Sequence, residues 1–147
     1  MVALGSLDYV LSLGIKPLGS DELSSPKVHL QDKVEGIEDV GGDDTPSLEK
    51  ILALKPDLIV GGGYQERFYR TMAQIAPTVL VASGHSGEWK TFLENIATAL
   101  HRTDQAEQVM ADYRDRIEAF QQAMGGEDRL KEIQVSIVRV YPQGIIS

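Results

Sequence analysis

Hydrophobic positions follow two different spacings along the chain, and this predicts alternating helices and strands. Apolar residues that recur every three or four positions are typical of amphipathic helices, whereas short continuous apolar runs are typical of buried parallel strands. The helical spacing is present at 6–13, 45–55, 65–75, 88–100 and 103–124, and strand-like runs at 2–4, 15–19, 36–42, 57–60, 78–81 and 133–140. This order predicts an α/β domain with a parallel sheet.

The helical pattern at 103–124 is longer than a crossover helix in a small domain requires. Thr103 is its predicted N-cap, and Gly125 and Gly126 end it. The strand pattern at 133–140 is apolar on both faces, and no helical pattern follows it. Either this strand joins the preceding sheet, or the chain is a fragment with one lobe, a spanning helix and the first strand of a second lobe. We favour the fragment.

Composition places the chain among ordinary globular proteins and limits the classes of partner that it can bind. Of its 147 residues, 42% are hydrophobic and 24% are charged, and the net charge is −8. An acidic protein is a poor general binder of nucleic acid or of anionic membranes. The chain has no cysteine, which excludes disulfides, thiolate metal sites and cysteine nucleophiles. We expect no leader in this chain, although a secreted protein whose leader had been removed would have the same sequence.

Signatures of enzymes and metal sites are incomplete. The segment 84–88 lacks the last glycine of the hydrolase pattern G-x-S-x-G. The glycines at 61–63 lie between a predicted strand and a predicted helix, where phosphate can bind, but the spacing of a nucleotide fingerprint is absent. His29, His85 and His101 are far apart and lack the spacing of metal ligands. We therefore expect no catalytic residues, no metal site and no resident cofactor.

Five segments of the sequence resemble one family of binding proteins. The most specific is 41–61, GGDDTPSLEKILALKPDLIVG, and the others are 11–19, 74–79, 87–90 and 96–100. Together they resemble the periplasmic or lipoprotein substrate-binding proteins of iron–siderophore and cobalamin ABC importers. The resemblance covers essentially the whole chain.

The resemblance implies a class III periplasmic-binding-protein fold, in which two Rossmann-like α/β lobes are joined by one long helix. Residues 1–102 would be most of the N-terminal lobe, 103–126 the spanning helix, and 127–147 the first strand of a truncated C-terminal lobe. The implied function is capture of a ferric siderophore in the cleft between the lobes and delivery to an ABC permease. The implied location is the periplasm, or the cell envelope as a lipoprotein.

Two other functions remain open. The first is binding of cobalamin or haem by a protein of the same family. The second is a small flavodoxin-like α/β enzyme that holds a phosphate-bearing cofactor at the glycines 61–63. Absorbance of the protein with added ferric siderophore or flavin distinguishes the classes.

Candidate ligand contacts lie in loops beyond the carboxyl ends of the predicted strands, where open α/β sheets bind ligands. Tyr64 and Trp89 offer flat apolar surfaces, Gln65 and Ser83 offer hydrogen bonds, and His85 lies in the same loop as Ser83. Packing in a helix is the competing interpretation for Trp89.

The resemblance adds two charged residues to these candidates. The segment 136–139 resembles a family pattern that places a ligand-facing arginine at Arg139, for which a surface charge is the alternative. Glu66 resembles by position a family glutamate that pairs with permease arginines, and a simple helix-start carboxylate is the alternative. We also expect the fragment to form a homodimer, or to exchange segments, through the strand at 133–140.

Overall fold

The computed structural model describes residues 1–23, 30–42, 45–82, 88–136, 140–141 and 144–145. The chain separates into two compact units, Met1–Val109 and Met110–Ser147, which are described in turn. Their boundary lies inside the long helix, so the division of the chain at 102 and 126 stays a prediction.

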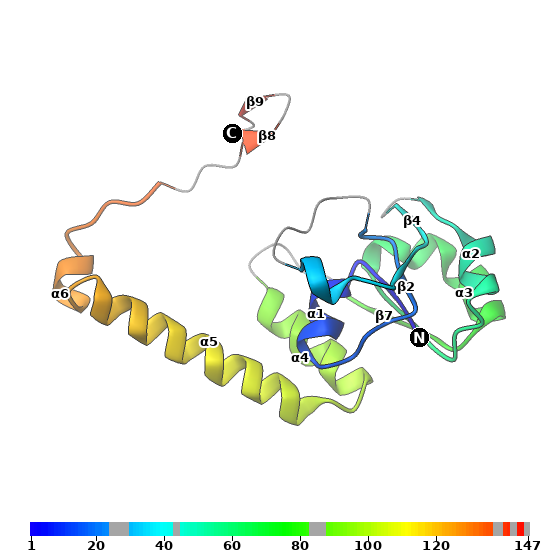
Figure 1. Cartoon of the computed structure of the whole chain (residues 1–147), viewed down its shortest axis with the longest axis horizontal. Coiled ribbons are helices and arrows are strands. Elements are labelled where there is room, and N and C mark those ends of the chain that lie inside the picture. Colours follow the sequence, from blue (N-terminus) through cyan, green and yellow to red (C-terminus); the bar gives the residue numbers. More distant parts are fainter. Residues whose placement is uncertain (24–29, 43–44, 83–87, 137–139, 142–143, 146–147) are drawn as a thin grey trace. The chain divides into compact units, whose positions relative to one another are not determined.

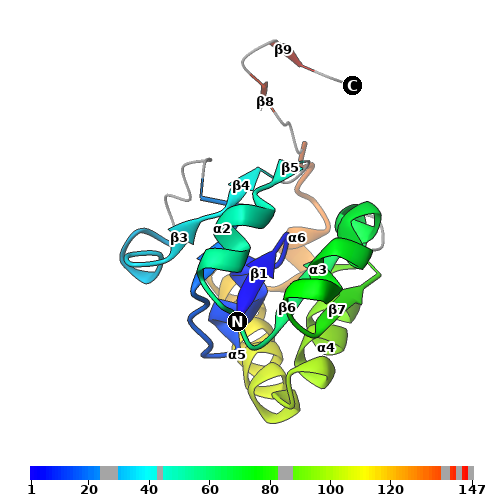
Figure 2. The same cartoon turned by 90° about the vertical axis from the view of Figure 1, so that its right-hand side faces the viewer.

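The first unit contains a five-stranded sheet of parallel strands. Its members are β1 (Val2–Leu4), β2 (Gly19–Ser20), β3 (Glu38–Asp39), β6 (Ile59–Gly62) and β7 (Thr78–Val81). The spatial order is β3-β2-β1-β6-β7, and Figure 2 labels β3, β1, β6 and β7 in this order across the sheet. The chain adds β2 and β3 on one side of β1 and then crosses to the other side. This change of direction between β1 and β6 is the topological switch point at which open α/β sheets bind ligands.

Helices cover both faces of the sheet, as the α/β prediction requires. Two of them, α1 (Leu7–Ser12) and α4 (Trp89–Ala99), pack together on one face, and α2 (Leu48–Ala53) and α3 (Tyr69–Ile75) pack together on the other (Figure 1). The helix predicted at 88–100 is observed as α4, which is one residue shorter at each end.

The core on the α2–α3 face follows the two-residue period of the strands. Val2 and Leu4 of β1 contribute to one cluster with Ile59 of β6, Ile51 of α2 and Met72 of α3, and all five are fully buried. Because successive strand side chains alternate between faces, this pattern gives the sheet two apolar sides.

The strand prediction at 2–4 is confirmed by β1, whereas those at 15–19 and 36–42 were partly wrong. The run at 15–19 forms a strand only from Gly19, because Pro17 has no N–H to give to a neighbouring strand. The run at 36–42 is divided into β3 and β4 (Gly41–Gly42), and β4 pairs antiparallel with β5 (Thr45–Pro46). Thr45 is therefore in a strand and is not the N-cap of α2. That position belongs to Ser47, whose Oγ accepts the Lys50 N–H.

The later predictions agree more closely with the structure. The strand at 78–81 is confirmed by β7. The strand at 57–60 is displaced to Ile59–Gly62, and the helix at 65–75 is divided into a 3₁₀ turn, η2 (Gly63–Phe68), and α3. A second 3₁₀ turn, η1 (Gln31–Lys33), lies between β2 and β3.

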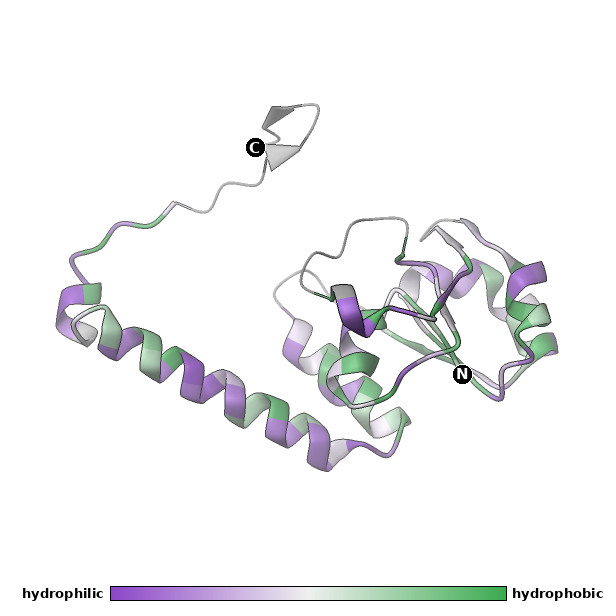
Figure 3. Ribbon diagram, in the orientation of Figure 1, coloured by the Kyte–Doolittle hydropathy of each residue, from purple (hydrophilic) through white to green (hydrophobic). Residues whose placement is uncertain are grey.

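The long helix α5 (Thr103–Ala123) begins in the first unit and ends in the second, where α6 (Glu127–Leu130) follows. Figure 3 shows α5 as mainly hydrophilic, with interspersed hydrophobic residues. Among the described residues, no helix combines the length and the apolar composition needed to cross a membrane.

The predicted strand at 133–140 was wrong in its described first half. Residues 133–136 adopt neither helix nor strand, and residues 137–139 lie outside the described part of the chain. Val140 belongs to β8 (Val140–Tyr141), which pairs antiparallel with β9 (Gly144–Ile145). A strand needs a neighbour that satisfies its backbone groups, and the described residues offer none to 133–136.

Candidate ligand-binding site

Loops from different parts of the chain meet at the carboxyl edge of the sheet. Gly5 follows β1, Asp21 follows β2, Gly63 follows β6 and Ala82 follows β7. Because all these strands are parallel, the four loops lie at the same edge, on either side of the switch point. The fold thus brings together the loops that the sequence identifies as candidate ligand contacts.

Gln65 is buried beneath these loops, with only 1% of its surface exposed. Its Oε1 accepts the Gly62 N–H at 3.1 Å, and its Nε2 donates to Asp21 Oδ2 at 3.3 Å. Both ends of the side-chain amide are therefore bonded within the protein. This arrangement favours a role in holding the loops over the direct ligand contact predicted for Gln65.

Asp21 is the functional candidate that the sequence analysis missed. Its carboxylate is fully buried, and Oδ1 accepts the Gly5 N–H at 2.8 Å while Oδ2 accepts from Gln65. Gly5 has a φ of +58°, a left-handed conformation that glycine adopts without steric cost. The available signal was an acidic residue directly after a strand, but the surrounding polar sequence indicated only a long loop.

A second carboxylate lies at the start of α1. Glu22 Oε2 accepts the Leu7 N–H at 2.6 Å, and the N–H of Glu22 donates to Ser20 Oγ at 3.3 Å. The N–H groups of Gly5, Leu7 and Gly62 are thus all bonded to side chains of the protein. Because these N–H groups already have partners within the protein, they are not available to hold a cofactor phosphate.

Aromatic side chains occupy the outer part of the edge. Tyr64 directly follows the first residue of η2, and 77% of its surface is exposed. Trp89 is half-buried at the first turn of α4, and the Lys90 ammonium lies 5.6 Å from the centre of its ring. Tyr64 is therefore available to a ligand, while the position of Trp89 agrees with both packing and contact.

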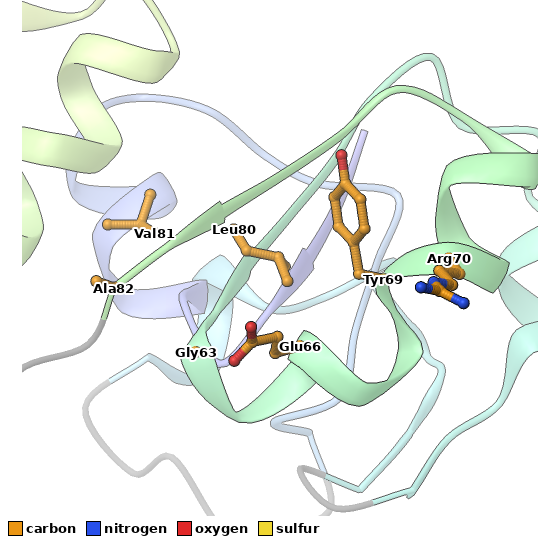
Figure 4. Close-up of a pocket in the computed structure, with 7 residues that line it drawn as sticks. All are labelled: Gly63, Glu66, Tyr69, Arg70, Leu80, Val81 and Ala82. Carbon is orange, nitrogen blue, oxygen red and sulfur yellow. The ribbon is translucent and has the colours of Figure 1, made fainter.

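A pocket of about 500 Å³ lies beside this edge, between η2, α3 and the edge strand β7. In Figure 4, η2 and α3 supply the charged and aromatic side chains, and β7 supplies the apolar ones. Its lining residues are Gly63, Glu66, Tyr69, Arg70, Leu80, Val81 and Ala82. Glu66, the predicted docking residue, is exposed here.

Three of the predicted ligand contacts have no structural description. Ser83 and His85 lie in the segment 83–87, and Arg139 lies in the segment 137–139, both outside the described residues. Among the residues that are described, no group of three or more metal-binding side chains comes together.

Comparison with known proteins gives the chain a family. A family model described as periplasmic binding protein matches residues 2–137. YfiY of Bacillus subtilis, named as a probable siderophore-binding lipoprotein, is 36% identical over 90% of this chain. The achromobactin-binding periplasmic protein of Dickeya dadantii is 31% identical over 84% of it.

Solved structures agree with the fold. The crystal structure of Staphylococcus aureus SirA complexed with staphyloferrin B superimposes with a TM-score of 0.69 and 32% identity. It matches 82% of this chain and 43% of that chain, and its fold is of the class III periplasmic-binding-protein type that the sequence predicts.

The chain spans 41% of the length of YfiY and 42% of the length of the Dickeya protein. Both relatives are named as binding proteins, and neither name describes an enzyme. On the match to residues 2–137 and on these relatives, the chain belongs to the periplasmic binding protein family.

Proposed function

We propose that this chain binds a ferric siderophore as part of the substrate-binding component of an ABC importer. The observation that carries the proposal is the identity of 36% over 90% of the chain with a relative named as siderophore-binding. The family match over residues 2–137 includes every strand end that borders the switch point. Relatives named for iron–hydroxamate and iron–citrate complexes support the same class of ligand.

The geometry supports a large organic ligand at this edge and disfavours a nucleotide-like one. Tyr64 offers an exposed ring for apolar contact with a chelate. The N–H groups that would hold a phosphate are bonded to Asp21, Glu22 and Gln65. Binding of a ferric chelate is therefore preferred to the flavodoxin-like alternative.

The described lobe would form one wall of a ligand cleft, and the exposed pocket beside it would face the transporter. Glu66 lines that pocket, which supports its assignment as a contact for permease arginines. The names of the relatives, periplasmic in one case and lipoprotein in the other, support a location outside the cytoplasm. A chain that presents one wall also exposes apolar side chains to a second copy, so the isolated chain would self-associate.

The experiment is a chemical-shift titration of the ¹⁵N-labelled chain with gallium(III) complexes of desferrioxamine and of citrate. Gallium(III) replaces iron(III) because it has the same charge and is diamagnetic. We expect shifts concentrated at Gly5, Gly63 and Tyr64, at the carboxyl edge of the sheet. The amide of Asp57, at the opposite edge, is the internal control.

Parallel titrations with cyanocobalamin, haem and flavin mononucleotide distinguish the alternatives. Shifts at the same edge with cyanocobalamin or haem alone would indicate that the ligand is one of these two compounds rather than a siderophore, within the same family. Shifts with flavin mononucleotide alone would favour the flavodoxin-like alternative. No shift with either gallium complex, or shifts confined to the region of Asp57, would overturn the proposal.

A further inference from the structure

Three neighbouring strand ends are joined by one buried side-chain pair. Asp21 follows β2, and its carboxylate accepts the N–H of Gly5, which follows β1. It also accepts Nε2 of Gln65, whose Oε1 accepts the N–H of Gly62 at the end of β6. The three strands are adjacent in the sheet, in the order β2-β1-β6. The pair therefore spans the switch point.

We infer that Asp21, acting through Gln65, is a positioning residue that holds the ligand-facing loops after β1 and β6 in one arrangement. The inference rests on the proposed function, because it assigns these loops to the ligand. Tyr64 lies between Gly62 and Gln65 in the sequence, so the two anchored positions fix the backbone on both sides of this exposed ring.

Because the pair is buried, its hydrogen bonds depend on which side-chain atoms donate and which accept. Asp21 and Gln65 are 0% and 1% exposed, so water does not replace a lost partner. In the bonds that join these strand ends, Asp21 accepts from Gly5 and from Gln65, and Gln65 accepts from Gly62. This arrangement of donors and acceptors satisfies all three bonds only with a carboxylate at one position and an amide at the other.

Asp21→Asn breaks the pattern with little change in shape. If Asn Oδ1 continues to accept from Gly5, its Nδ2 faces the donor Nε2 of Gln65. A flip of the Gln65 amide only moves the conflict to the N–H of Gly62, and a flip of the asparagine moves it to the N–H of Gly5. One donor therefore always faces another donor.

The exchange Asp21→Asn with Gln65→Glu restores these three bonds. Asn Oδ1 accepts from Gly5, its Nδ2 donates to one glutamate oxygen, and the other glutamate oxygen accepts from Gly62. The net charge of the double variant equals that of the original chain. A pair that only fills space gains nothing from this exchange, which makes it the test of a positioning role.

The test measures affinity for gallium(III)–desferrioxamine and the amide signals of Gly5 and Gly62 in the 147-residue chain. We expect Asp21→Asn to weaken binding by about tenfold, because a smaller fraction of the molecules then holds the loops after β1 and β6 in the arrangement that binds the ligand. The Gly5 or Gly62 amide should lose protection from hydrogen exchange. The double variant should regain the protection and bind within about twofold of the original chain.

Asp128→Asn is the matched control, since it removes an exposed carboxylate of α6 that forms an ion pair with Lys131 at 3.2 Å. Unchanged affinity of Asp21→Asn would overturn the inference, and so would a double variant that regains protection but not affinity. If Asp21→Asn does not fold, fast exchange of the Gly5 and Gly62 amides in the original chain would overturn it. Failure of the original chain to bind the gallium complex refutes the proposed function, whereas the exchange data still test the pair.

Discussion

The rings of Tyr9 and Phe92 meet edge to face, with centroids 4.8 Å apart and planes inclined by 75°. Tyr9 belongs to α1 and Phe92 to α4, so this contact joins the two helices that cover one face of the sheet. Burial raises the pKa of the Tyr9 hydroxyl above its ordinary value of 10.0, and the negative charges of Asp8 and Glu22 raise it further.

The raised pKa of Tyr9 predicts a loss of stability at alkaline pH. A group with a higher pKa in the folded state stabilises that state fully below its unfolded pKa, and the contribution is lost as the pH rises above that value. We therefore expect the free energy of unfolding in urea to fall above a pH of about 10. Tyr9→Phe is the control, because it keeps the ring contact and should remove this part of the slope. An equal slope in both chains would contradict the prediction.

Gly41→Ala should destabilise the chain by roughly 3 kcal/mol. Gly41 has a φ of +112°, and an added Cβ would lie 2.6 Å from the carbonyl oxygen of Thr45, in the pairing of β4 with β5. Gly36→Ala is the matched control, since Gly36 also has a positive φ, of +76°, but its Cβ would meet nothing within 4 Å. We expect the control to cost about 1 kcal/mol. Similar losses of unfolding free energy in the two variants, measured by chemical denaturation, would show that the close approach at Gly41 is unimportant.

Tyr64→Ala should weaken binding of a ferric chelate by about tenfold, or about 1.4 kcal/mol, because an exposed ring at the switch point is lost. The measurement is the gallium(III)–desferrioxamine titration followed by amide shifts. Tyr69→Ala serves as the control, since Tyr69 is an exposed tyrosine that lines the neighbouring pocket. Equal losses in the two variants would argue against a specific contact by Tyr64.

Glu66→Ala should lower uptake of the ferric complex while affinity for the ligand stays unchanged. The carboxylate is exposed at the pocket beside β7, where a partner's cationic side chain has access. Uptake of ⁵⁵Fe is measured in cells that carry the substitution in the native genetic context, and affinity is measured on the purified protein. Glu94→Ala, which removes an exposed carboxylate of α4, is the control. Normal uptake, or a loss of ligand affinity, would refute the docking assignment.

Local sequence patterns predicted the elements whose boundaries depend on local chemistry. The apolar run at 78–81 is β7, and the helix predicted at 103–124 is observed at Thr103–Ala123, with Thr103 as its first helical residue rather than its N-cap. Two predictions failed where a strand required backbone pairing with another strand. The strand at 15–19 is reduced because Pro17 has no N–H to donate, and 133–136 form no strand because no described neighbour pairs with them.

At the candidate site, too, local sequence patterns predicted some features and missed others. Tyr64 was identified from its position after a strand, and its exposure agrees with that interpretation. The partnership of Asp21 with Gln65 joins residues 44 positions apart, and no local pattern indicates it. Strand order decides that β1 separates β2 from β6, and this order places the two residues within hydrogen-bonding distance. The sequence therefore predicted the edge at which the site lies but not the bonds that organise it.

Exposed apolar side chains, rather than the strand expected at 133–140, now predict self-association of the 147-residue chain. The expected strand at 133–140 is not formed at 133–136, but Val135 is 76% exposed and Phe120 of α5 is 59% exposed. Burial of one large apolar side chain contributes roughly 1.5–3 kcal/mol, so a few such contacts between two copies offset the entropy cost of association.

We expect light scattering over a concentration series to show a dimer of the 147-residue chain. A chain that ends at Gly126 keeps α5 but loses Val135, so it separates the two exposed regions. The variant Phe120→Glu tests the helix directly, because a charge on that surface opposes its burial. A dimer that survives truncation but not Phe120→Glu would locate the contact on α5. A chain that remains monomeric at every concentration would refute self-association. The exposed apolar side chains would then stay in contact with water instead of a second copy.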